Sequence, residues 1–363
     1  MKNIADSPRR MWMTLCLLAL AIVLVIVIDS LSFSVGHSTD VLSSGEENTS
    51  PDFTETDLPA DSESETVVSS LTEKESNTVR LTFLGECAPG SPFATNAYGS
   101  LNALTANFGT EYFFSDIRDI LASDDLTVAS NTCLFTDDTS LSATPMCAAP
   151  ASSASVYADG SVEVIVDFTG SNDPSAANDA IVGTGVTVVD SGEQFFEIGG
   201  IRIALFTTVI TKDTDHSALL TKIDETDADY VILYFYGGEE NSHTVETWMK
   251  NALYTFSVTG ADLLVGAGNG VLRPAEYYDD SVIAYSLGCL IDGSQLVPEN
   301  ASVLLQIDLL RQEDGSVKAD VRFIPCYVYI DSWQPTLMTD AGDAELVHRF
   351  LHGESQMPIE IAG

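Results

Sequence analysis

The sequence has little positive charge. Its 363 residues contain 15 Lys and Arg against 54 Asp and Glu, so the formal net charge is −39 at pH 7. A surface of this sign repels nucleic acids and anionic lipid headgroups, because their phosphates carry the same charge. We therefore expect no nucleic-acid partner, and we expect that binding of any polyanion needs bridging cations.

Several motifs of known catalytic sites are also missing. The sequence has no CxxC pair, no Cys/His spacing typical of a zinc site and no Gly-x-Ser-x-Gly elbow. The run 266–270 is glycine-rich, but Val271 follows it in place of the Lys and Ser/Thr of a phosphate-binding loop. The common signatures of nucleotide, zinc and serine-hydrolase sites are therefore excluded. The 5 histidines are scattered, at His37, His216, His243, His348 and His352.

One long hydrophobic run is present, near the N-terminus. Residues 11–28 are uncharged and apolar, and about 20 such residues cross a hydrocarbon core. Lys2, Arg9 and Arg10 precede the run, so the positive-inside rule predicts a cytoplasmic segment 1–10, a transmembrane anchor 11–28 and export of the rest. The alternative is a cleaved signal peptide, although residues 30–32 (Ser-Leu-Ser) match a cleavage site poorly. The predicted location is the cell membrane, with a single pass and the main domain outside the cell.

The composition changes after this run. Residues 29–78 are rich in Ser, Thr, Asp and Glu, with 12 acidic residues against Lys74 alone, which predicts a disordered acidic linker extended by charge repulsion. Residues 79–363 have the composition of a globular domain and enough length for one large core. This part holds 41 acidic and 11 basic residues, a formal charge of −30.

Apolar runs of strand length alternate with helical patterns through residues 79–363. A strand–helix succession followed by strand–strand hairpins predicts a layered α/β fold, with helices covering sheets. Gly199 and Gly200 predict a hairpin turn, because both residues can adopt positive φ. The expected strands are 79–85, 126–130, 162–168, 186–189, 201–208, 230–236, 262–266, 282–287, 303–309 and 317–329, and the expected helices are 112–122, 175–182, 218–227, 243–258 and 343–351.

Five cysteines lie in the part predicted to be exported, where disulfides can persist. Cys133 and Cys147 flank a polar loop. Their spacing is compatible with either of two states, a disulfide that closes this loop or a pair of free thiols.

Polar residues follow several predicted strands, which is where sites lie in α/β folds. Carboxylate and amide oxygens suit calcium or magnesium, so these residues are candidate ligands of a weakly bound divalent cation. Asn and Asp after strands also cap helices and close turns, and Asp173-Pro174 before a helical pattern is typical of such a cap. The candidates are Glu86, Asn131, Asn172, Asp173 and Glu239.

The order and spacing of these segments resemble the bacterial capsule-synthesis CapA family, which is associated with poly-γ-glutamate export. The similarity covers residue 79 to the C-terminus and implies a calcineurin-like metallophosphoesterase fold, an α/β/β/α sandwich. Its most specific pieces are residues 260–262 (Gly-Ala-Asp), the frame 266–274, residues 276–277 (Glu-Tyr) and residues 285–288 (Tyr-Ser-Leu-Gly).

The chain departs from the family pattern at the positions of the metal-binding motifs. Glu86 replaces the Asp after the first strand, and Phe235, Gly268 and Gly270 stand at histidine positions. Residues 130–133 (Ser-Asn-Thr-Cys) replace Gly-Asn-Leu-Glu, and residues 171–173 (Ser-Asn-Asp) replace Asn-Asn-His. A calcineurin-like site needs imidazoles and carboxylates, whereas glycine and phenylalanine supply no ligand.

The resemblance also places two cysteines at the rim of the corresponding site. Cys289 replaces the final Asn of the family pattern, and Cys87 follows Glu86, so a disulfide across the rim is conceivable.

We therefore expect a degenerate family member without hydrolytic chemistry. It would act as a binding or scaffold component in the synthesis, export or anchoring of a capsular polymer. Its partners would be capsule-synthesis membrane proteins or the extracellular polymer. No cofactor is expected beyond a weakly held calcium or magnesium at Glu86, Asp173 and Glu239. The alternatives are an active metal-dependent hydrolase that uses these three residues, and a structural subunit of a membrane complex.

Overall fold

The computed structural model describes residues 71–75, 77–91, 100–138, 147–169, 174–292, 300–329 and 332–355. The predicted anchor 11–28 lies outside these residues, as does the linker up to residue 70. No helix within the described ranges is long and apolar enough to cross a membrane.

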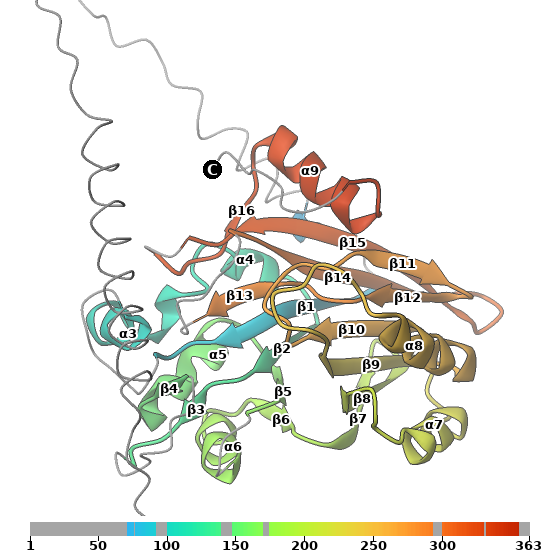
Figure 1. The fold of residues 1–363 in the computed structure, drawn as a ribbon, viewed down its shortest axis with the longest axis horizontal. Coiled ribbons are helices and arrows are strands. Elements are labelled where there is room, and N and C mark those ends of the chain that lie inside the picture. Colours follow the sequence, from blue (N-terminus) through green and yellow to red (C-terminus); the bar gives the residue numbers. More distant parts are fainter. Residues whose placement is uncertain are drawn as a thin grey trace, which may run out of the picture. The chain divides into compact units, whose positions relative to one another are not determined.

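Two mixed β-sheets form the centre of the fold (Figure 1). The first sheet has eight strands in the order β16-β15-β14-β1-β2-β5-β6, with β13 paired to β1. Strands β1, β2, β5 and β6 run parallel, and β14 and β15 form an antiparallel hairpin beside them. The strands are β1 (Thr78–Ala88), β2 (Leu126–Asn131), β5 (Val164–Asp167), β6 (Thr187–Val189), β13 (Cys289–Asp292), β14 (Ala301–Arg311), β15 (Val317–Tyr327) and β16 (Thr336–Leu337).

The second sheet has six strands in the order β11-β12-β10-β9-β8-β7. Its inner strands run parallel, and both edge strands pair antiparallel. Gly199 and Gly200 have φ of 56° and 78° and join β7 to β8, which confirms the predicted hairpin turn. The strands are β7 (Gly192–Ile198), β8 (Ile201–Ile210), β9 (Tyr230–Gly237), β10 (Leu263–Ala267), β11 (Ala275–Tyr278) and β12 (Ser281–Ala284).

Three apolar clusters show that the fold is layered. One lies between the sheets and includes Leu81 and Phe83 of β1 together with Ile232 of β9. The other two lie on the outer faces and include residues of the covering helices. The predicted layered α/β fold is therefore confirmed. The outer layer of the first sheet contains helices α3 (Leu101–Phe108), α4 (Arg118–Leu121), α5 (Ser155–Asp159) and α6 (Pro174–Val182). The outer layer of the second sheet contains α7 (Ser217–Asp224) and α8 (Thr247–Thr259). Helix α9 (Ala341–Leu351) packs against the inter-sheet cluster.

Several expected elements are shorter than predicted, and two of them affect the path of the chain. The helix expected at 112–122 is interrupted, because the backbone N–H and hydroxyl of Ser115 both bind the carbonyl of Tyr112 and replace the regular helical pattern. The strand expected at 282–287 ends at Ala284. Gly288, with φ of 78°, then turns the chain into β13, which joins the first sheet. The same chain segment therefore connects the two sheets.

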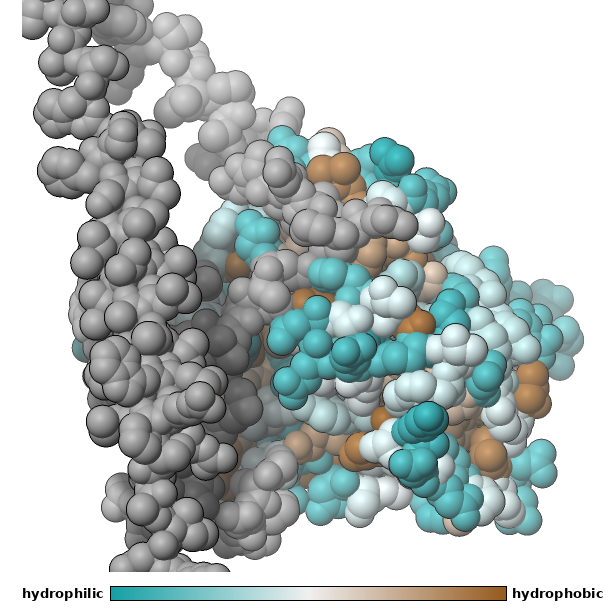
Figure 2. Space-filling model, viewed as in Figure 1, coloured by the Kyte–Doolittle hydropathy of each residue, from teal (hydrophilic) through white to brown (hydrophobic). Residues whose placement is uncertain are grey.

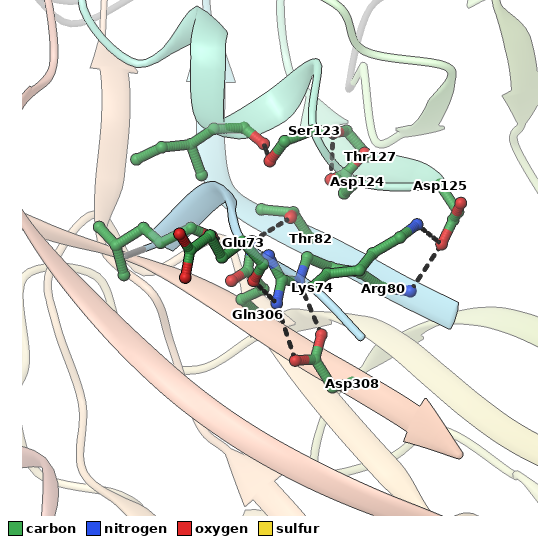
Figure 3. A network of polar contacts seen from close by, with 12 residues as sticks. Glu73, Lys74, Arg80, Thr82, Ser123, Asp124, Asp125, Thr127, Gln306 and Asp308 are labelled. Carbon is green, nitrogen blue, oxygen red and sulfur yellow. Dashed lines mark hydrogen bonds and ion pairs between the residues drawn. The ribbon is translucent and has the colours of Figure 1, made fainter. Parts of the chain in front are cut away.

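A buried arginine fixes the start of β1 (Figure 3). The Arg80 side chain is 1% exposed, and its Nε and Nη2 donate to both carboxylate oxygens of Asp308 at 2.7 and 2.9 Å. Its Nη1 and Nη2 also donate to the backbone carbonyls of Leu71 and Glu73 at 2.8 Å. Residues 71–75 are thereby attached at the amino-terminal end of β1, at the opposite end of the strand from Glu86.

The face seen in Figure 2 carries mainly hydrophilic residues, with apolar ones scattered among them. The exposed large apolar side chains of the described residues come from separate elements, including Phe108 of α3, Val182 of α6 and Val209 of β8. Scattered exposed apolar residues are normal on a folded domain and need no partner.

Candidate functional site

The carboxyl end of β1 meets chain segments from the second sheet at Glu86. The Glu86 backbone N–H donates to the Gly288 carbonyl at 3.0 Å, and the Tyr234 hydroxyl of β9 donates to the Leu84 carbonyl at 2.8 Å. Gly85 makes this approach possible, since a Cβ at this residue would lie 2.2 Å from the Gly288 carbonyl oxygen. Glu86 therefore lies where the two sheets come together.

The carboxyl group of Glu86 receives few hydrogen bonds. The Thr132 hydroxyl donates to its Oε1 at 3.1 Å, the backbone N–H of Gly268 also donates to it, and the Cys289 thiol lies 3.9 Å from Oε2. Burial, followed by the charge of Asp292, raises the pKa of Glu86 from its ordinary value of 4.5 to about 7. A substantial fraction of these carboxyl groups is therefore protonated at neutral pH.

Asn131 lies on the strand next to Glu86 but on the other face of the sheet. It is in register with Cys87, and because side chains alternate along a strand, Glu86 and Asn131 point in opposite directions. The Asn131 amide nitrogen donates to Asp167 at 2.6 Å, and its amide oxygen accepts from the Tyr157 hydroxyl at 2.7 Å. The structure therefore does not bring Asn131 and Glu86 together.

Asp167 is a buried polar residue that the sequence analysis did not single out. It ends β5, is 5% exposed, and its Oδ1 accepts from Asn131 and from the Thr169 hydroxyl. Its Oδ2 is buried without a hydrogen-bond partner among the described residues, and burial raises the pKa of Asp167. The available signal was an acidic residue inside the apolar run 162–168.

The acidic turn after β9 places Glu240, rather than Glu239, near Glu86. The Glu239 side chain is exposed, and its backbone N–H donates to Glu246 at 2.6 Å. The charge of Glu240 contributes to raising the pKa of both Glu86 and Tyr236. Sequence spacing could not distinguish these adjacent glutamates, because the direction of each side chain depends on the local turn.

A second buried arginine fixes this turn. Arg273 has a fully buried side chain and donates to the Ser242 and Glu239 carbonyls at 2.8 and 3.1 Å. Its Nη1 also pairs with the Glu246 carboxylate at 3.0 Å. These contacts hold residues 239–246 in a loop, so α8 begins at Thr247 and not at residue 243 as expected.

Comparison with known proteins gives a family for this arrangement. Residues 175–294 match the model of the family described as bacterial capsule synthesis protein PGA_cap. The PGA biosynthesis protein CapA of Bacillus subtilis (strain 168) is 28% identical over 153 residues, which cover 37% of this chain and 40% of that protein. This part of the chain is therefore similar to the CapA family. Its match spans less than half the length of this curated relative.

Comparison with solved structures gives low TM-scores and low sequence identities. A hypothetical protein from Thermus thermophilus has a TM-score of 0.43 at 15% identity, over 68% of this chain and 99% of that chain. Haemophilus influenzae NAD nucleotidase gives 0.39 at 11%, over 69% and 50%. The 5′-nucleotidase from Candida albicans gives 0.38 at 12%, over 76% and 57%.

The three positions where the CapA resemblance expects histidine are arranged differently from one another. Phe235 is fully buried in the outer cluster beside α8, whereas its neighbour Tyr236 packs against the inter-sheet cluster that Glu86 faces. Gly268 has φ of +95°, and a Cβ there would lie 2.4 Å from the Tyr236 ring. Gly270 has φ of +79°. The Tyr236 ring therefore fills the space beside Gly268 that a side chain would need.

The described residues do not fit the bimetallic centre that the resemblance to calcineurin-like proteins implies. No group of three or more His, Cys, Asp or Glu side chains that could hold a metal occurs in the described ranges. The amide of Asn131 is engaged on the opposite face of the sheet, and residue 235 faces the outer layer. Asn172 and Asp173 lie outside the described residues, so their role as oxygen ligands or helix cap stays a prediction, as does a weakly held calcium or magnesium.

The five cysteines of the domain are buried, and they lie in different parts of the fold. Cys87 belongs to the outer cluster of the first sheet, whereas the Cys289 thiol lies beside Glu86 on the inter-sheet side. A disulfide between these two residues would have to pass through the sheet, so the possibility raised for the rim is wrong. Cys133 and Cys147 lie together in the outer cluster.

Proposed function

We propose that this chain is a non-hydrolytic CapA family member that binds or scaffolds an envelope polymer during capsule synthesis, export or anchoring. The observation that supports it is the Tyr236 ring packed against Gly268, next to the Glu86 carboxyl group, whose pKa burial raises to about 7. A transition-metal centre needs imidazole or several carboxylate ligands, and a metal-activated water depends on such a centre. Loss of these ligands supports retention of the fold for binding.

The proposed location follows from residues 11–28, which would anchor the chain with its main domain outside the cell. The proposed fold type is the metallophosphoesterase-like α/β/β/α sandwich, and the proposed partners are capsule-synthesis membrane proteins or the polymer itself. A poly-γ-glutamate-type polymer is suggested by the family resemblance, and the curated relative is named as a PGA biosynthesis protein. Because residues 79–363 carry a formal charge of −30, an anionic polymer would approach only with divalent cations between the two.

One observation favours hydrolysis as a second candidate function. A carboxyl group with a pKa of about 7, as at Glu86, can give and take a proton near neutral pH, which suits general acid–base catalysis. Such an enzyme would still need an electrophile or an activated nucleophile, and the described residues around Glu86 offer neither an imidazole nor an arginine in contact with it.

Metal analysis and a hydrolysis assay separate the two functions. The full-length chain, purified in detergent, should contain far less than one equivalent of Mn, Fe or Zn. With added Mn²⁺ it should hydrolyse bis-p-nitrophenyl phosphate no faster than the Glu86→Ala variant. A stoichiometric metal together with turnover that disappears in Glu86→Ala would refute the proposal.

Polymer binding tests the proposed role directly. Full-length chain should sediment with poly-γ-glutamate beads in millimolar Ca²⁺ and should stay in the supernatant in EDTA, because only the cation offsets the charge repulsion. Beads carrying neutral dextran provide the control. Equal retention in Ca²⁺ and EDTA would contradict the bridging argument, and no retention under either condition would contradict the polymer-binding role.

A further inference from the structure

Cys133 and Cys147 occupy adjacent positions on two paired strands. They directly precede β3 (Leu134–Phe135) and β4 (Ala148–Ala149), which run parallel with Leu134 opposite Ala148. The Leu134 N–H donates to the Cys147 carbonyl at 3.1 Å, so the pairing extends to the cysteines themselves. Neighbouring strands lie about 4.8 Å apart, within the roughly 4.4–6.8 Å range of Cα separations that disulfides span.

Both sulfur atoms lie against the same short stretch of chain. The Cys147 Sγ is 3.3 Å from the Ala88 carbonyl oxygen. A Cβ on Gly90 would lie 2.5 Å from the Cys133 Sγ, so the absence of a side chain at Gly90 makes room for that sulfur. The two thiols also hydrogen-bond to each other. Backbone pairing and sulfur placement thus agree that these side chains face one another.

The other thiols have different surroundings. Cys289 lies beside Glu86 on the inter-sheet side. Cys326 lies on β15, opposite Leu337 of β16. Cys87 and Cys326 share the outer cluster with Cys133 and Cys147. The Cys87 thiol, however, contacts the Gly85 carbonyl at 3.6 Å on its own strand, and the Cys326 thiol contacts the Ile324 carbonyl at 3.7 Å on its own strand. The arrangement therefore favours a single pair among the five.

We propose that Cys133 and Cys147 form a disulfide in the exported chain and close the segment 134–146 as a covalent loop. The proposal rests on the proposed extracytoplasmic location, where disulfides persist. The oxidant would be a thiol–disulfide oxidoreductase that carries a disulfide. One cysteine thiolate attacks this disulfide and forms a mixed disulfide, and the second thiolate then displaces the oxidant. Two thiols are oxidised, and their two electrons and two protons end on the sulfurs of the reduced oxidoreductase.

Burial determines when this exchange occurs. Cys133 and Cys147 are 0% and 4% exposed, so an oxidoreductase reaches them only before the domain has finished folding. The finished bond would be shielded from reductants for the same reason. It would also restrict the unfolded chain and thereby stabilise the fold next to the segment that follows Glu86.

The test is a peptide map of full-length chain that was extracted from membranes in denaturant with N-ethylmaleimide, so that free thiols are blocked at once. We expect peptides containing Cys133 and Cys147 to be linked before reduction and separate after it. Cys133→Ser should leave Cys147 alkylated and lower the thermal midpoint by several degrees. Adding Cys147→Ser should then cause almost no further loss, since the bond is already absent. Cys326→Ser, the matched control, should leave the link in place.

Two results would overturn the assignment. The first uses protease added outside intact cells, whose cleavage of the linker 29–78 shows that the chain is exported; alkylation of both cysteines in such a chain would overturn the disulfide. The second is a disulfide link from either cysteine to Cys87. A linker that the external protease does not reach would instead refute the proposed location. In that case the full-length chain is unfolded, refolded in a glutathione redox buffer and examined by the same peptide map. If Cys133 and Cys147 are not linked after refolding, the proposed disulfide is wrong.

Discussion

Replacing Glu86 by glutamine tests whether its carboxyl group is protonated in the folded chain. Glutamine has nearly the same shape as the protonated acid, still accepts hydrogen bonds from Thr132 and Gly268, and cannot ionise. Any pH dependence that comes from this one carboxyl group therefore disappears in the variant. The difference between variant and wild type isolates its contribution from that of the many other acidic residues.

The magnitude follows from the two pKa values. The pKa of Glu86 is about 7 in the folded chain against an ordinary 4.5, so the folded state retains a proton that the unfolded state releases. The stabilising contribution of this group is fully present below pH 4.5 and is lost as the pH rises through 7. Each pH unit in this window is worth about 1.4 kcal/mol. Between pH 5 and 8, Glu86→Gln should gain at most about 2–3 kcal/mol relative to wild type, less whatever the partial solvent contact of the side chain screens.

The assay is thermal unfolding of both full-length proteins at pH 5 and pH 8. For a domain of this size, each kcal/mol shifts the thermal midpoint by about 2–4 °C. Between pH 5 and pH 8 the midpoint of the variant should therefore rise relative to wild type by roughly 5–10 °C. Glu239→Gln provides the matched control, because it makes the same chemical change at an exposed side chain. If the Glu86→Gln difference is also the same at both pH values, Glu86 titrates as an ordinary carboxyl group and the reasoning about its burial is wrong.

Two further substitutions test the contacts described above. Asp308→Ala leaves the 1% exposed Arg80 side chain without its carboxylate and should lower the free energy of unfolding in urea by about 3–5 kcal/mol. Arg202→Ala breaks a pair whose arginine is 44% exposed and should cost under about 1 kcal/mol, so similar losses would contradict the distinction. Gly268→Ala and Gly315→Ala both place a side chain at positive φ, +95° and +91°, but only the first meets an aromatic ring, at 2.4 Å. We expect about 1–2 kcal/mol of backbone strain at both positions and about 1–3 kcal/mol more at Gly268; equal losses in urea unfolding would show that the ring moves aside freely.

Much of the strand content could be predicted from local sequence. The apolar runs 230–236 and 303–309 became β9 and β14, because a strand buried on both faces needs apolar residues at nearly every position. The short strands β3, β4 and β16 were missed, since two residues carry no period that a sequence can display.

The sequence by itself determined which chemical groups follow the strands: an acid at Glu86, no imidazole at 235, 268 or 270, and a pair of cysteines around one loop. Only the tertiary structure decided which of these groups face one another. A shift in pairing between Phe83 and Glu86 turns Glu86 toward the second sheet, while the neighbouring Asn131 points to the helices. A displacement of one residue along a strand reverses the face of every side chain on it, and that displacement is fixed by pairing with strands far away in the sequence.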